Sequence, residues 1–321
     1  MTTRAPRIAV TSPSFSRHPR LRDELCAHFP GAVLNERGVA LDGAALVRFL
    51  ADAEGAVVGL ERIDDAVLRQ LPRLRILAKY GVGLDNLALA DCARRGVRVA
   101  WTPGVNAQAV AELTLTFVLG LANGAFARAA ELRGGRWNKT GGALLAGRTV
   151  GIVGLGHVGR TVAALLAPFG CRLLGNDVED RRAWCASVGV TPATKDEIYA
   201  AADVVTLHVP LTAETRHLID ARALAAFRPG AMLVNTSRGA VVDQAALRDA
   251  LVAGRLGGAA LDVWEAEPAA DPALLALPNV IGTPHIGGAA AEAVLAMGRT
   301  AIGHLVEHFD AERAEGARVC G

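Results

Sequence analysis

Aromatic residues are scarce in this 321-residue chain. Tryptophan, tyrosine and phenylalanine make up 4% of the residues although 51% are hydrophobic, and the excess lies in alanine, valine, leucine and glycine. Small and branched apolar side chains suit helices and strands that pack closely. The chain also exceeds the size at which one hydrophobic core usually stops growing, so we expect a layered α/β protein with two compact domains.

The chain has no excess of charge of one sign and no long apolar run near its start. Its formal net charge is +2, and the lysines and arginines are scattered rather than gathered in a stripe, so nucleic acid is not an expected partner. The apolar residues 8–10 are too few for a signal peptide. Residues 107–126 are apolar but interrupted by polar side chains, which predicts a buried helix and no membrane partner.

Cysteine is also sparse. The five cysteines are Cys26, Cys92, Cys171, Cys185 and Cys320. They are odd in number and far apart, and they show none of the short Cys/His spacings of metal sites, so we expect no metal. A reducing cytoplasm suits such a set best, and each thiol is expected to be a packing residue without chemistry.

Short apolar runs alternate with amphipathic stretches along the first hundred residues. The runs begin at Ile8, Ala32, Ala56, Ile76 and Val97. This rhythm of strands and helices is typical of a parallel sheet. Residues 107–126 follow and are so uniformly apolar that we expect a helix without a solvent face, at the seam between two domains.

A second and more apolar series comes next, with runs that begin at Thr149, Arg172, Val204, Ala231, Ala259 and Val280. Continuous hydrophobicity marks strands covered on both faces, as in a doubly wound sheet. The last helical stretch, residues 289–309, has no strand after it and is expected to pack on the first domain. We predict two doubly wound parallel-sheet domains: residues 1–103 with 289–321, and residues 104–288 inserted between them.

Three glycines, Gly154, Gly156 and Gly159, end an apolar strand and open a helix. The first allows a tight turn, the second lets backbone approach a pyrophosphate, and the third lets helix and strand pack closely. The next strand ends at Asp177, at the distance of about 20 residues where an acid binds the adenosine ribose. Because Asp177 would repel a 2′-phosphate, the pattern predicts NAD as the cofactor rather than NADP.

The start of the helix that follows these glycines carries His157 and Val158, where the pyrophosphate is expected. Arg181 and Arg182 come shortly after Asp177 and leave two alternatives open. They weaken the preference for NAD, or they form a solvated helix face with the neighbouring acidic residues.

Seven segments of the chain together resemble a known family. They are Lys79-Tyr-Gly-Val-Gly-Leu-Asp-Asn, Asn106-Ala-Gln-Ala-Val-Ala-Glu-Leu-Thr, the glycine segment 151–159, His208-Val-Pro-Leu-Thr, Val234-Asn-Thr-Ser-Arg-Gly, Leu261-Asp-Val-Trp-Glu-Ala-Glu-Pro and Thr283-Pro-His-Ile-Gly-Gly. In this order and spacing they resemble the D-isomer-specific 2-hydroxyacid dehydrogenases, nearest to 3-phosphoglycerate dehydrogenase-like members without a C-terminal regulatory domain.

The resemblance implies a Rossmann-type NAD-binding domain inserted into a flavodoxin-like substrate domain, with catalysis in the cleft. Relatives of this kind are commonly homodimers that meet through the nucleotide domains, and residues 107–126 with the loop to Trp137 suit that role. Since the chain stops at Gly321, serine feedback through a C-terminal domain is not expected.

The catalytic residues of the family correspond here to Arg238, Glu267 and His285. Reduction of a 2-oxo acid needs a hydride at carbon 2 and a proton at its oxygen, and imidazole titrates near working pH, so His285 can move that proton. Glu267 would orient the ring and favour imidazolium. Arg238 offers a planar fork for carboxylate and carbonyl oxygens. Glu265 competes with Glu267 for the acid role, and Glu267 is preferred because it precedes Pro268, as in the family.

The resemblance also implies contacts with both ligands. Further cofactor contacts correspond to His208, Val209, Pro210, Thr215, Thr236, Asp262 and Gly287, together with Arg238 and His285. Substrate contacts correspond to Lys79, Tyr80, Gly81, Val82 and Gly83, again with Arg238 and His285. Lys79 stands where 3-phosphoglycerate dehydrogenases often carry an arginine that reaches the substrate phosphate, which favours 3-phosphohydroxypyruvate. The alternative is that Lys79 pairs with a nearby carboxylate.

Other functions stay open at this stage. Glyoxylate, hydroxypyruvate and branched 2-oxo acids are alternative substrates, whereas the Glu-Pro pair argues against the formate-oxidising branch. The family's fold also serves as an NADH-responsive co-repressor that binds partner peptides. That function predicts long disordered extensions, which this sequence lacks. A catalytically idle NAD-binding module is disfavoured by the intact arginine, glutamate and histidine set.

Overall fold

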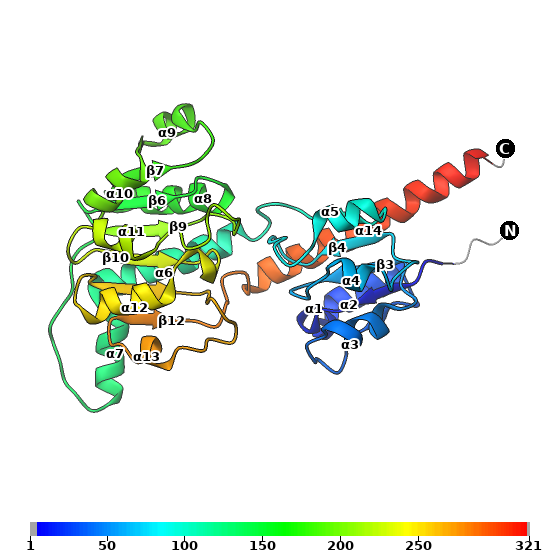
Figure 1. The fold of residues 1–321 in the computed structure, drawn as a ribbon, viewed down its shortest axis with the longest axis horizontal. Helices are drawn as coiled ribbons and strands as arrows, with labels where there is room; N and C mark the ends of the chain where they lie inside the picture. The colour runs from blue at the N-terminus through cyan, green and yellow to red at the C-terminus, as the bar shows by residue number, and fades with distance from the viewer. Residues whose placement is uncertain (1–4, 320–321) are drawn as a thin grey trace. The chain divides into compact units, whose positions relative to one another are not determined.

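The computed structural model describes residues 5–319, with side chains as far as Ala314. The chain divides into two compact units. The first contains the residues up to Asn106 and those from Ala291 onward, and the second contains residues 107–290. Each unit is a parallel sheet covered by helices (Figure 1).

The first unit is built on five parallel strands. Their order is β2 (Val33–Leu34), β1 (Ile8–Val10), β3 (Gly55–Val58), β4 (Ile76–Lys79) and β5 (Arg98–Ala100). This is the strand order of a flavodoxin-like sheet. Successive residues of a strand point to opposite faces, so Ile8 and Val10 enter one core cluster and Ala9 enters the other.

Helices cover both faces of the first sheet. On one face lie α1 (Pro13–Arg17), α2 (Pro19–His28) and α14 (Ala291–Val319), and on the other lie α3 (Gly43–Leu50), α4 (Asp65–Leu68) and α5 (Leu89–Arg94). The last helix therefore belongs to the first sheet, where Leu305 and Phe309 are buried beside Ile8 and Leu25.

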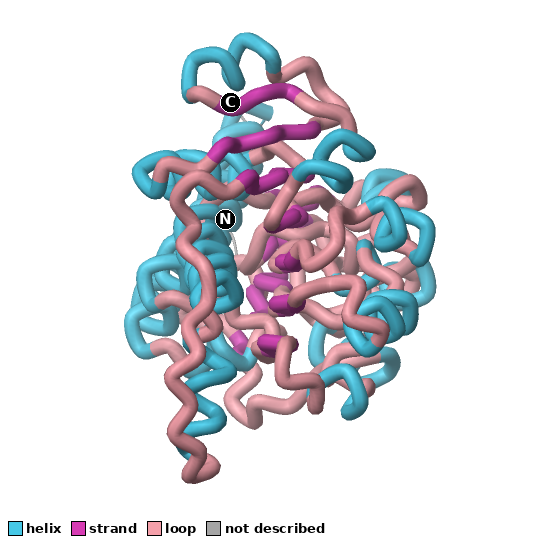
Figure 2. Tube along the Cα trace, turned by 90° about the vertical axis from the view of Figure 1, so that its left-hand side faces the viewer, coloured by secondary structure: helices cyan, strands magenta, loops and turns pink. Residues whose placement is uncertain are grey.

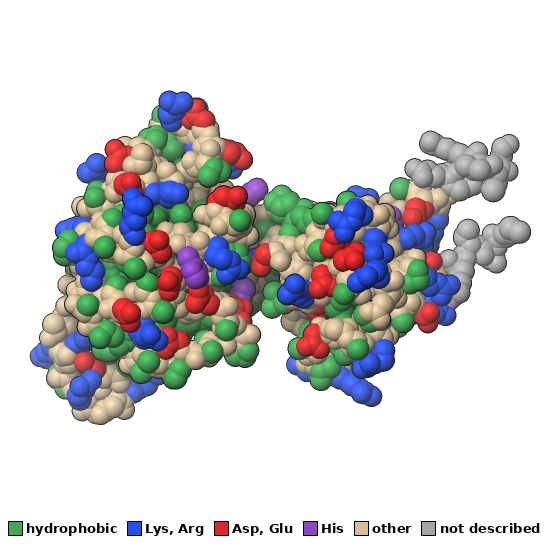
Figure 3. All heavy atoms as spheres, viewed as in Figure 1, with side chains coloured by type: hydrophobic (Ala, Val, Ile, Leu, Met, Phe, Trp, Pro, Cys, Tyr) green, Lys and Arg blue, Asp and Glu red, His purple; other side chains and the backbone are tan. Residues whose placement is uncertain are grey.

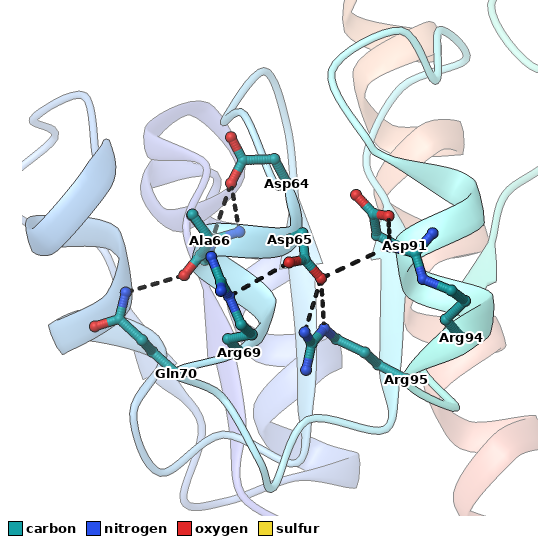
Figure 4. A network of polar contacts seen from close by, with 9 residues as sticks. Asp64, Asp65, Ala66, Arg69, Gln70, Asp91, Arg94 and Arg95 are labelled. Carbon is teal, nitrogen blue, oxygen red and sulfur yellow. Dashed lines mark hydrogen bonds and ion pairs between the residues drawn. The ribbon is translucent and has the colours of Figure 1, made fainter.

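Charged side chains join α4 to α5 (Figure 4). Asp64 begins α4 by accepting the backbone N–H of Val67 at 3.2 Å. Asp65 accepts a hydrogen bond from Arg95 at 2.9 Å and lies 3.3 Å from Arg69. The bond from Arg95 holds the pKa of Asp65 below its usual value. These groups are exposed, so water and salt screen them and the cluster adds little to stability.

The second unit is built on seven parallel strands. Their order is β12 (Val280–Gly282), β11 (Gly258–Leu261), β10 (Met232–Asn235), β9 (Val204–Leu207), β6 (Thr149–Val153), β7 (Arg172–Asn176) and β8 (Val190–Pro192). The chain starts at β6, moves outward through β7 and β8, and then returns to β9, which is the Rossmann arrangement. β8 was not predicted from the sequence, because only Val190 of its three residues is buried.

Two helical layers enclose this sheet. One contains α6 (Ala107–Asn123) and α8 (His157–Leu166), and the other contains α10 (Lys195–Ala201), α11 (Ala221–Ala226) and α12 (Gln244–Val252). The shorter elements are α7 (Ala125–Arg133), η1 (Ala167–Phe169), α9 (Arg182–Val188), η2 (Gly239–Val241) and α13 (Pro272–Leu275). In Figure 2 the strands are stacked in the middle with helices to both sides. Val150 and Ile152 pack toward the first layer and Val153 toward the second.

The prediction that residues 107–126 form one helix without a solvent face is wrong. The helix ends at Asn123, because Gly124 adopts a left-handed φ of 71° before α7 begins. It exposes three polar residues spaced by four, Gln108, Glu112 and Thr116. That spacing places them on one side of the helix. Half-buried leucines beside this stripe disguised it in the sequence.

No single helix in residues 5–319 is long and apolar enough to cross a membrane. The pair α6 and α7, bent by 71°, reaches the necessary length and composition only when both are counted together.

Acidic and basic side chains are interspersed on the face of each unit that Figure 3 shows. Four cysteines, Cys26, Cys92, Cys171 and Cys185, are free thiols, and Cys320 lies outside the described residues. Burial raises the pKa of the thiols of Cys92, Cys171 and Cys185, which favours their weakly nucleophilic protonated form.

Candidate active site

The three candidate catalytic residues lie on loops at the carboxyl edge of the second sheet. Arg238 follows β10, Glu267 follows β11 and His285 follows β12. These strands are neighbours in the sheet. Open parallel sheets bind their ligands at this edge, so the topology brings the three loops together where a ligand is expected.

His285 and Glu267 form a hydrogen-bonded pair. His285 Nδ1 lies 2.8 Å from Glu267 Oε2. The bond to Glu267 and its charge raise the pKa of His285. Burial is the largest single influence on Glu267 and raises its pKa, but the bond and charge of His285, the Trp264 N–H and the charge of Arg238 together outweigh burial and lower the pKa of Glu267. With Nδ1 engaged, Nε2 is the ring nitrogen left to exchange a proton with a ligand.

Asp262 holds the backbone of His285 in an unusual conformation. His285 has a left-handed φ of 56°, a strain of about 1 to 3 kcal/mol for a non-glycine residue. Its N–H donates to the Asp262 carbonyl at 2.8 Å, and the Asp262 carboxylate accepts the N–H groups of Ile286 and Gly287, each at 2.7 Å. The hydroxyl of Thr283 donates to the same carboxylate at 2.5 Å. Asp262, 1% exposed, therefore organises the His285 loop, and its predicted contact with nicotinamide stays a prediction.

Trp264 holds the loop that carries Glu267. Its backbone N–H donates to Glu267 Oε1 at 3.1 Å, and its indole N–H donates to the Thr283 carbonyl at 3.0 Å. The peptide bond between Glu267 and Pro268 is cis. The loops after β11 and β12 are thus joined by Trp264 as well as by the catalytic pair.

Arg238 lies close to this pair. Its guanidinium donates to the Ser237 carbonyl at 2.7 Å, and its charge lowers the pKa of both Glu267 and His285. Asn235 shapes the turn by donating to the Arg238 carbonyl at 2.9 Å. All three candidate catalytic side chains therefore come from the second unit.

The glycine segment has the geometry of a dinucleotide cradle. Gly154 has a φ of 97°, and a Cβ there would lie 2.4 Å from the His208 carbonyl oxygen. A Cβ on Gly159 would lie 1.9 Å from the Gly154 carbonyl oxygen, so only glycine lets α8 approach β6 this closely. A Cβ on Gly156 meets nothing within 4 Å, which leaves open space at the start of α8, where His157 and Val158 follow. A pyrophosphate fits that space.

Asp177 closes the cradle from the end of β7. Its carboxylate accepts the backbone N–H groups of Leu155 at 2.6 Å and Glu179 at 2.9 Å. These two bonds fix the carboxylate beside the glycine segment, where the ribose of a dinucleotide is expected.

The two arginines after Asp177 are paired with acidic neighbours. Arg182 makes a two-pronged contact with Asp180, at 3.0 Å and 2.7 Å, and Arg181 pairs with Glu179. Arg182, exposed and paired with Asp180, fits the solvated-face alternative, whereas Arg181 is half-buried.

His208 follows β9 and carries an unsatisfied nitrogen. Its Nε2 lies 3.0 Å from the Thr206 hydroxyl, while its buried Nδ1 has no hydrogen-bond partner among residues 5–319. Burial lowers the pKa of His208 to about 3, so the ring is neutral. The backbone carbonyl of His208 lies beside Gly154, and an orphaned ring nitrogen on the same residue fits a site that receives a polar ligand.

Two predicted cofactor residues use their hydroxyls within the protein. Thr215 donates to the Pro210 carbonyl at 2.6 Å and thereby shapes the turn that follows Val209. Thr236 lies 2.9 Å from the Thr114 hydroxyl of α6 and is 8% exposed. Their contacts with a dinucleotide stay predictions.

Lys79 ends β4 in the first unit. It is 3% exposed, and its ammonium donates to the Gly59 carbonyl at 2.5 Å and to Asn86 Oδ1 at 2.7 Å. Asn86 in turn donates to the Glu61 carbonyl at 2.6 Å. Lys79 thus joins the loops that follow β3 and β4. After it, Tyr80 packs its ring edge-on against Phe15, with centroids 5.5 Å apart.

The rest of the predicted substrate loop is half-buried. It consists of Gly81, Val82 and Gly83. Gly81 has a φ of 134°, which only glycine adopts without strain.

Glu265 and Glu267 bind different histidines. Glu265 Oε1 lies 2.5 Å from Nε2 of His217, whereas Glu267 faces His285. His217 and Gln244 were not predicted from the sequence. The side-chain oxygen of Gln244 accepts the N–H of Glu265 at 2.5 Å. His217 lies at the end of the segment that begins with the predicted contacts His208, Val209 and Pro210. No local sequence pattern indicates that its backbone adopts a left-handed φ of 51°. Among the described residues, no group of three or more His, Cys, Asp or Glu side chains could hold a metal ion.

Residues 115–287 match the family model described as the NAD binding domain of D-isomer specific 2-hydroxyacid dehydrogenases. This match covers more than half of the chain. The chain belongs to that family. The predicted family, the Rossmann-type fold and the NAD cofactor are therefore confirmed, while the individual ligand contacts stay predictions.

Similar proteins carry several reductase and dehydrogenase names. D-3-phosphoglycerate dehydrogenase of Mycobacterium tuberculosis is 40% identical over 233 residues, 72% of this chain and 44% of that one. Hydroxypyruvate reductase of Thermotoga maritima is 34% identical, over 79% of this chain and 84% of that one. The structure of D-lactate dehydrogenase from Aquifex aeolicus with NAD and lactic acid is 26% identical, with a TM-score of 0.82 and 96% of each chain covered. The chain spans about half the length of the 3-phosphoglycerate dehydrogenases it matches.

Proposed function

We propose that the protein is an NAD-dependent dehydrogenase that interconverts a small D-2-hydroxy acid and its 2-oxo acid. The observation that carries this proposal is the His285–Glu267 pair with Arg238 beside it, on three adjacent strand ends of an NAD-binding domain. A merely NADH-sensing module needs the glycine cradle but has no use for a tuned proton donor.

When bound, the dinucleotide would supply or accept the hydride that carbon 2 of the acid gains or loses in the proposed reaction. During reduction, His285 Nε2 donates a proton to the oxygen on carbon 2, and the reverse reaction returns that proton. Glu267 keeps His285 protonated and fixes its ring. Arg238 grips the carboxylate and the reacting oxygen and so holds carbon 2 in place.

The dinucleotide would be held by the second unit. Gly154, Gly156 and Gly159 with the start of α8 would receive the pyrophosphate, and Asp177 would bind the adenosine ribose. The nicotinamide half is assigned to the predicted residues His208, Val209, Pro210, Thr215, Thr236, Asp262 and Gly287. The N–H groups of Gly81 and Gly83, in the proposed substrate domain, stay the predicted contacts of the substrate carboxylate.

Hydroxypyruvate and glyoxylate are our preferred substrates over 3-phosphohydroxypyruvate. The phosphorylated acid is suggested by Lys79 and by the 40% identical relative. However, the Lys79 ammonium already donates to Gly59 and Asn86 and is 3% exposed, so it has little surface to offer a phosphate. The relative covered to 84% of its length is a hydroxypyruvate reductase, which agrees with this preference.

The test follows NADH oxidation by its ultraviolet absorbance with a panel of 2-oxo acids. Hydroxypyruvate and 3-phosphohydroxypyruvate differ only by the phosphate, so their ratio of kcat/KM reports on phosphate recognition directly. We expect at least one acid to be reduced, with His285→Asn slower by a factor on the order of 10² to 10⁴. Tight NADH binding without turnover of any acid would instead support the co-repressor-like alternative.

We also propose that the protein is a cytoplasmic homodimer. The location is supported by the free thiols of the described cysteines. The dimer is supported by exposed apolar side chains on α7 and the long loop that follows it, which Figure 1 shows between α7 and β6. Leu132 is 57% exposed, Trp137 77% and Leu144 81%, which is unusual for a surface that faces only water.

A further inference from the structure

The second unit contains a second histidine–carboxylate pair beside the first. His217 Nε2 and Glu265 Oε1 are 2.5 Å apart. Glu265 stands two residues before Glu267 in the same loop, and His217 lies at the end of the segment that follows β9. Glu265 competes with Glu267 for the acid role in the sequence, and the proposed reaction does not use it.

His217 is anchored to the loop that carries Arg238. Its backbone has a left-handed φ of 51°, and its N–H donates to the Ala240 carbonyl at 2.8 Å. Two residues later Ile219 forms a parallel bridge with Val242. The segment after β9 therefore lies along the segment after β10, just beyond Arg238.

Glu265 is anchored on its other side. Its N–H donates at 2.5 Å to the side chain of Gln244, which is 9% exposed at the start of α12. A Cβ on Gly239 would lie 2.0 Å from the Trp264 carbonyl oxygen, so these two loops also touch through their backbones. The His217–Glu265 bond thus closes a ring of contacts between the loops after β9, β10 and β11.

From this arrangement we infer that His217 and Glu265 are positioning residues for proton transfer: they hold the Trp264–Glu267 loop so that Glu267 stays on His285. The inference rests on the proposed function for its kinetic consequence. An isolated surface ion pair would contribute little, but this pair is coupled to a buried amide and to a backbone that has little freedom. Loss of the bond frees the loop, Glu267 moves away from His285, and the proton donor loses its partner.

The variants are His217→Asn, Glu265→Ala, Glu265→Gln and the double variant of His217→Asn with Glu265→Ala. Asparagine tolerates a left-handed backbone but is too short to reach Glu265, so His217→Asn removes the bond with little backbone strain. Glu265→Gln keeps an oxygen acceptor of the same length. The matched control is Arg228→Gln, which removes an ion pair with Asp203 at the amino edge of the same sheet.

Two readouts are needed, the pH profile of kcat/KM for the preferred acid and the pKa of His285 followed by imidazole NMR. We expect His217→Asn and Glu265→Ala each to lower kcat/KM about tenfold and to lower the pKa of His285. The double variant should be no worse than either single variant, and Glu265→Gln should recover most of the loss. Arg228→Gln should leave both readouts unchanged.

The outcomes separate this inference from the proposed function. If wild-type protein reduces an acid but His217→Asn and Glu265→Ala match Arg228→Gln in rate and in the pKa of His285, the pair is an ordinary surface contact and the inference is wrong. If no acid is reduced, the proposed function fails, and the NMR titration still decides whether the pair positions Glu267. A lower melting temperature with an unchanged pKa of His285 also counts against the inference.

Discussion

At the scale of single residues, the site is organised by acidic side chains with different tasks. Glu267 acts on the charge of His285, whereas Asp262 acts on its backbone by accepting the N–H groups of Ile286 and Gly287. A buried carboxylate that accepts several hydrogen bonds is satisfied, and it can hold a strained neighbour in place. The unusual φ of His285 is therefore maintained by contacts across two strand ends.

The effect of Glu267 on His285 predicts a shift in the pH profile. In the proposed reaction, reduction needs imidazolium, and Glu267 raises the pKa of His285, so the protonated form persists to higher pH in the wild type. In Glu267→Gln the alkaline fall in the reduction rate should move to lower pH, with a smaller kcat at neutral pH. The measurement is kcat for the preferred acid between pH 5 and 9, and Glu307→Gln on α14 is the control. An unchanged alkaline limb would show that His285 is not the titrating donor.

At the scale of elements, different glycines of the strand–glycine–helix segment serve folding and cofactor binding. Gly159 touches the Gly154 carbonyl, whereas Gly156 faces open space, although both belong to one motif. An alanine at Gly159 therefore tests the packing of α8 on β6, and an alanine at Gly156 tests NADH binding.

Gly159→Ala should destabilise the protein by about 3 kcal/mol, because its Cβ would lie 1.9 Å from a backbone oxygen and α8 must move away from β6. Gly156→Ala should leave stability within about 1 kcal/mol, because its φ of −73° suits alanine, yet it should weaken NADH binding about tenfold or more. Thermal unfolding and titration of NADH fluorescence measure the two effects. Equal losses of stability in both variants would contradict the division of roles.

At the scale of the whole molecule, the exposed loop after α7 predicts the assembly. Trp137 and Leu144 are each more than three quarters exposed. Burying them against a second copy would stabilise the dimer by about 25 cal/mol for each Å² of apolar surface removed from water. Light scattering should give twice the mass of the chain, and the combined change Trp137→Ser and Leu144→Ser should shift the protein toward monomer. Exposed Val178→Ser, near the ribose site, is a control that should not change the mass. A wild-type monomer at micromolar concentration would contradict the proposed dimer.

The sequence was sufficient for what depends on local pattern. Short apolar runs predicted eleven of the strands that form the two sheets, and the spacing of three glycines with Asp177 predicted the NAD-binding strand and helix. These features are legible because burial on both faces and close backbone approach each demand particular residue types at fixed positions. β8 was missed because only one of its three residues is buried, and the solvent stripe of α6 was missed because half-buried leucines lie beside its three polar residues.

Tertiary structure alone decided which side chains meet. Pro268 favoured Glu267 over Glu265 through the family resemblance, but nothing local reveals that Glu265 binds His217 or that Lys79 donates to Gly59 and Asn86. These contacts join loops from different strands, so they follow from the parallel order of the sheet and from backbone turns such as those at His217 and His285. Sequence specifies the chemistry available at each loop, and the sheet order determines which loops share a site, because contacts between strand ends are set by topology rather than by distance along the chain.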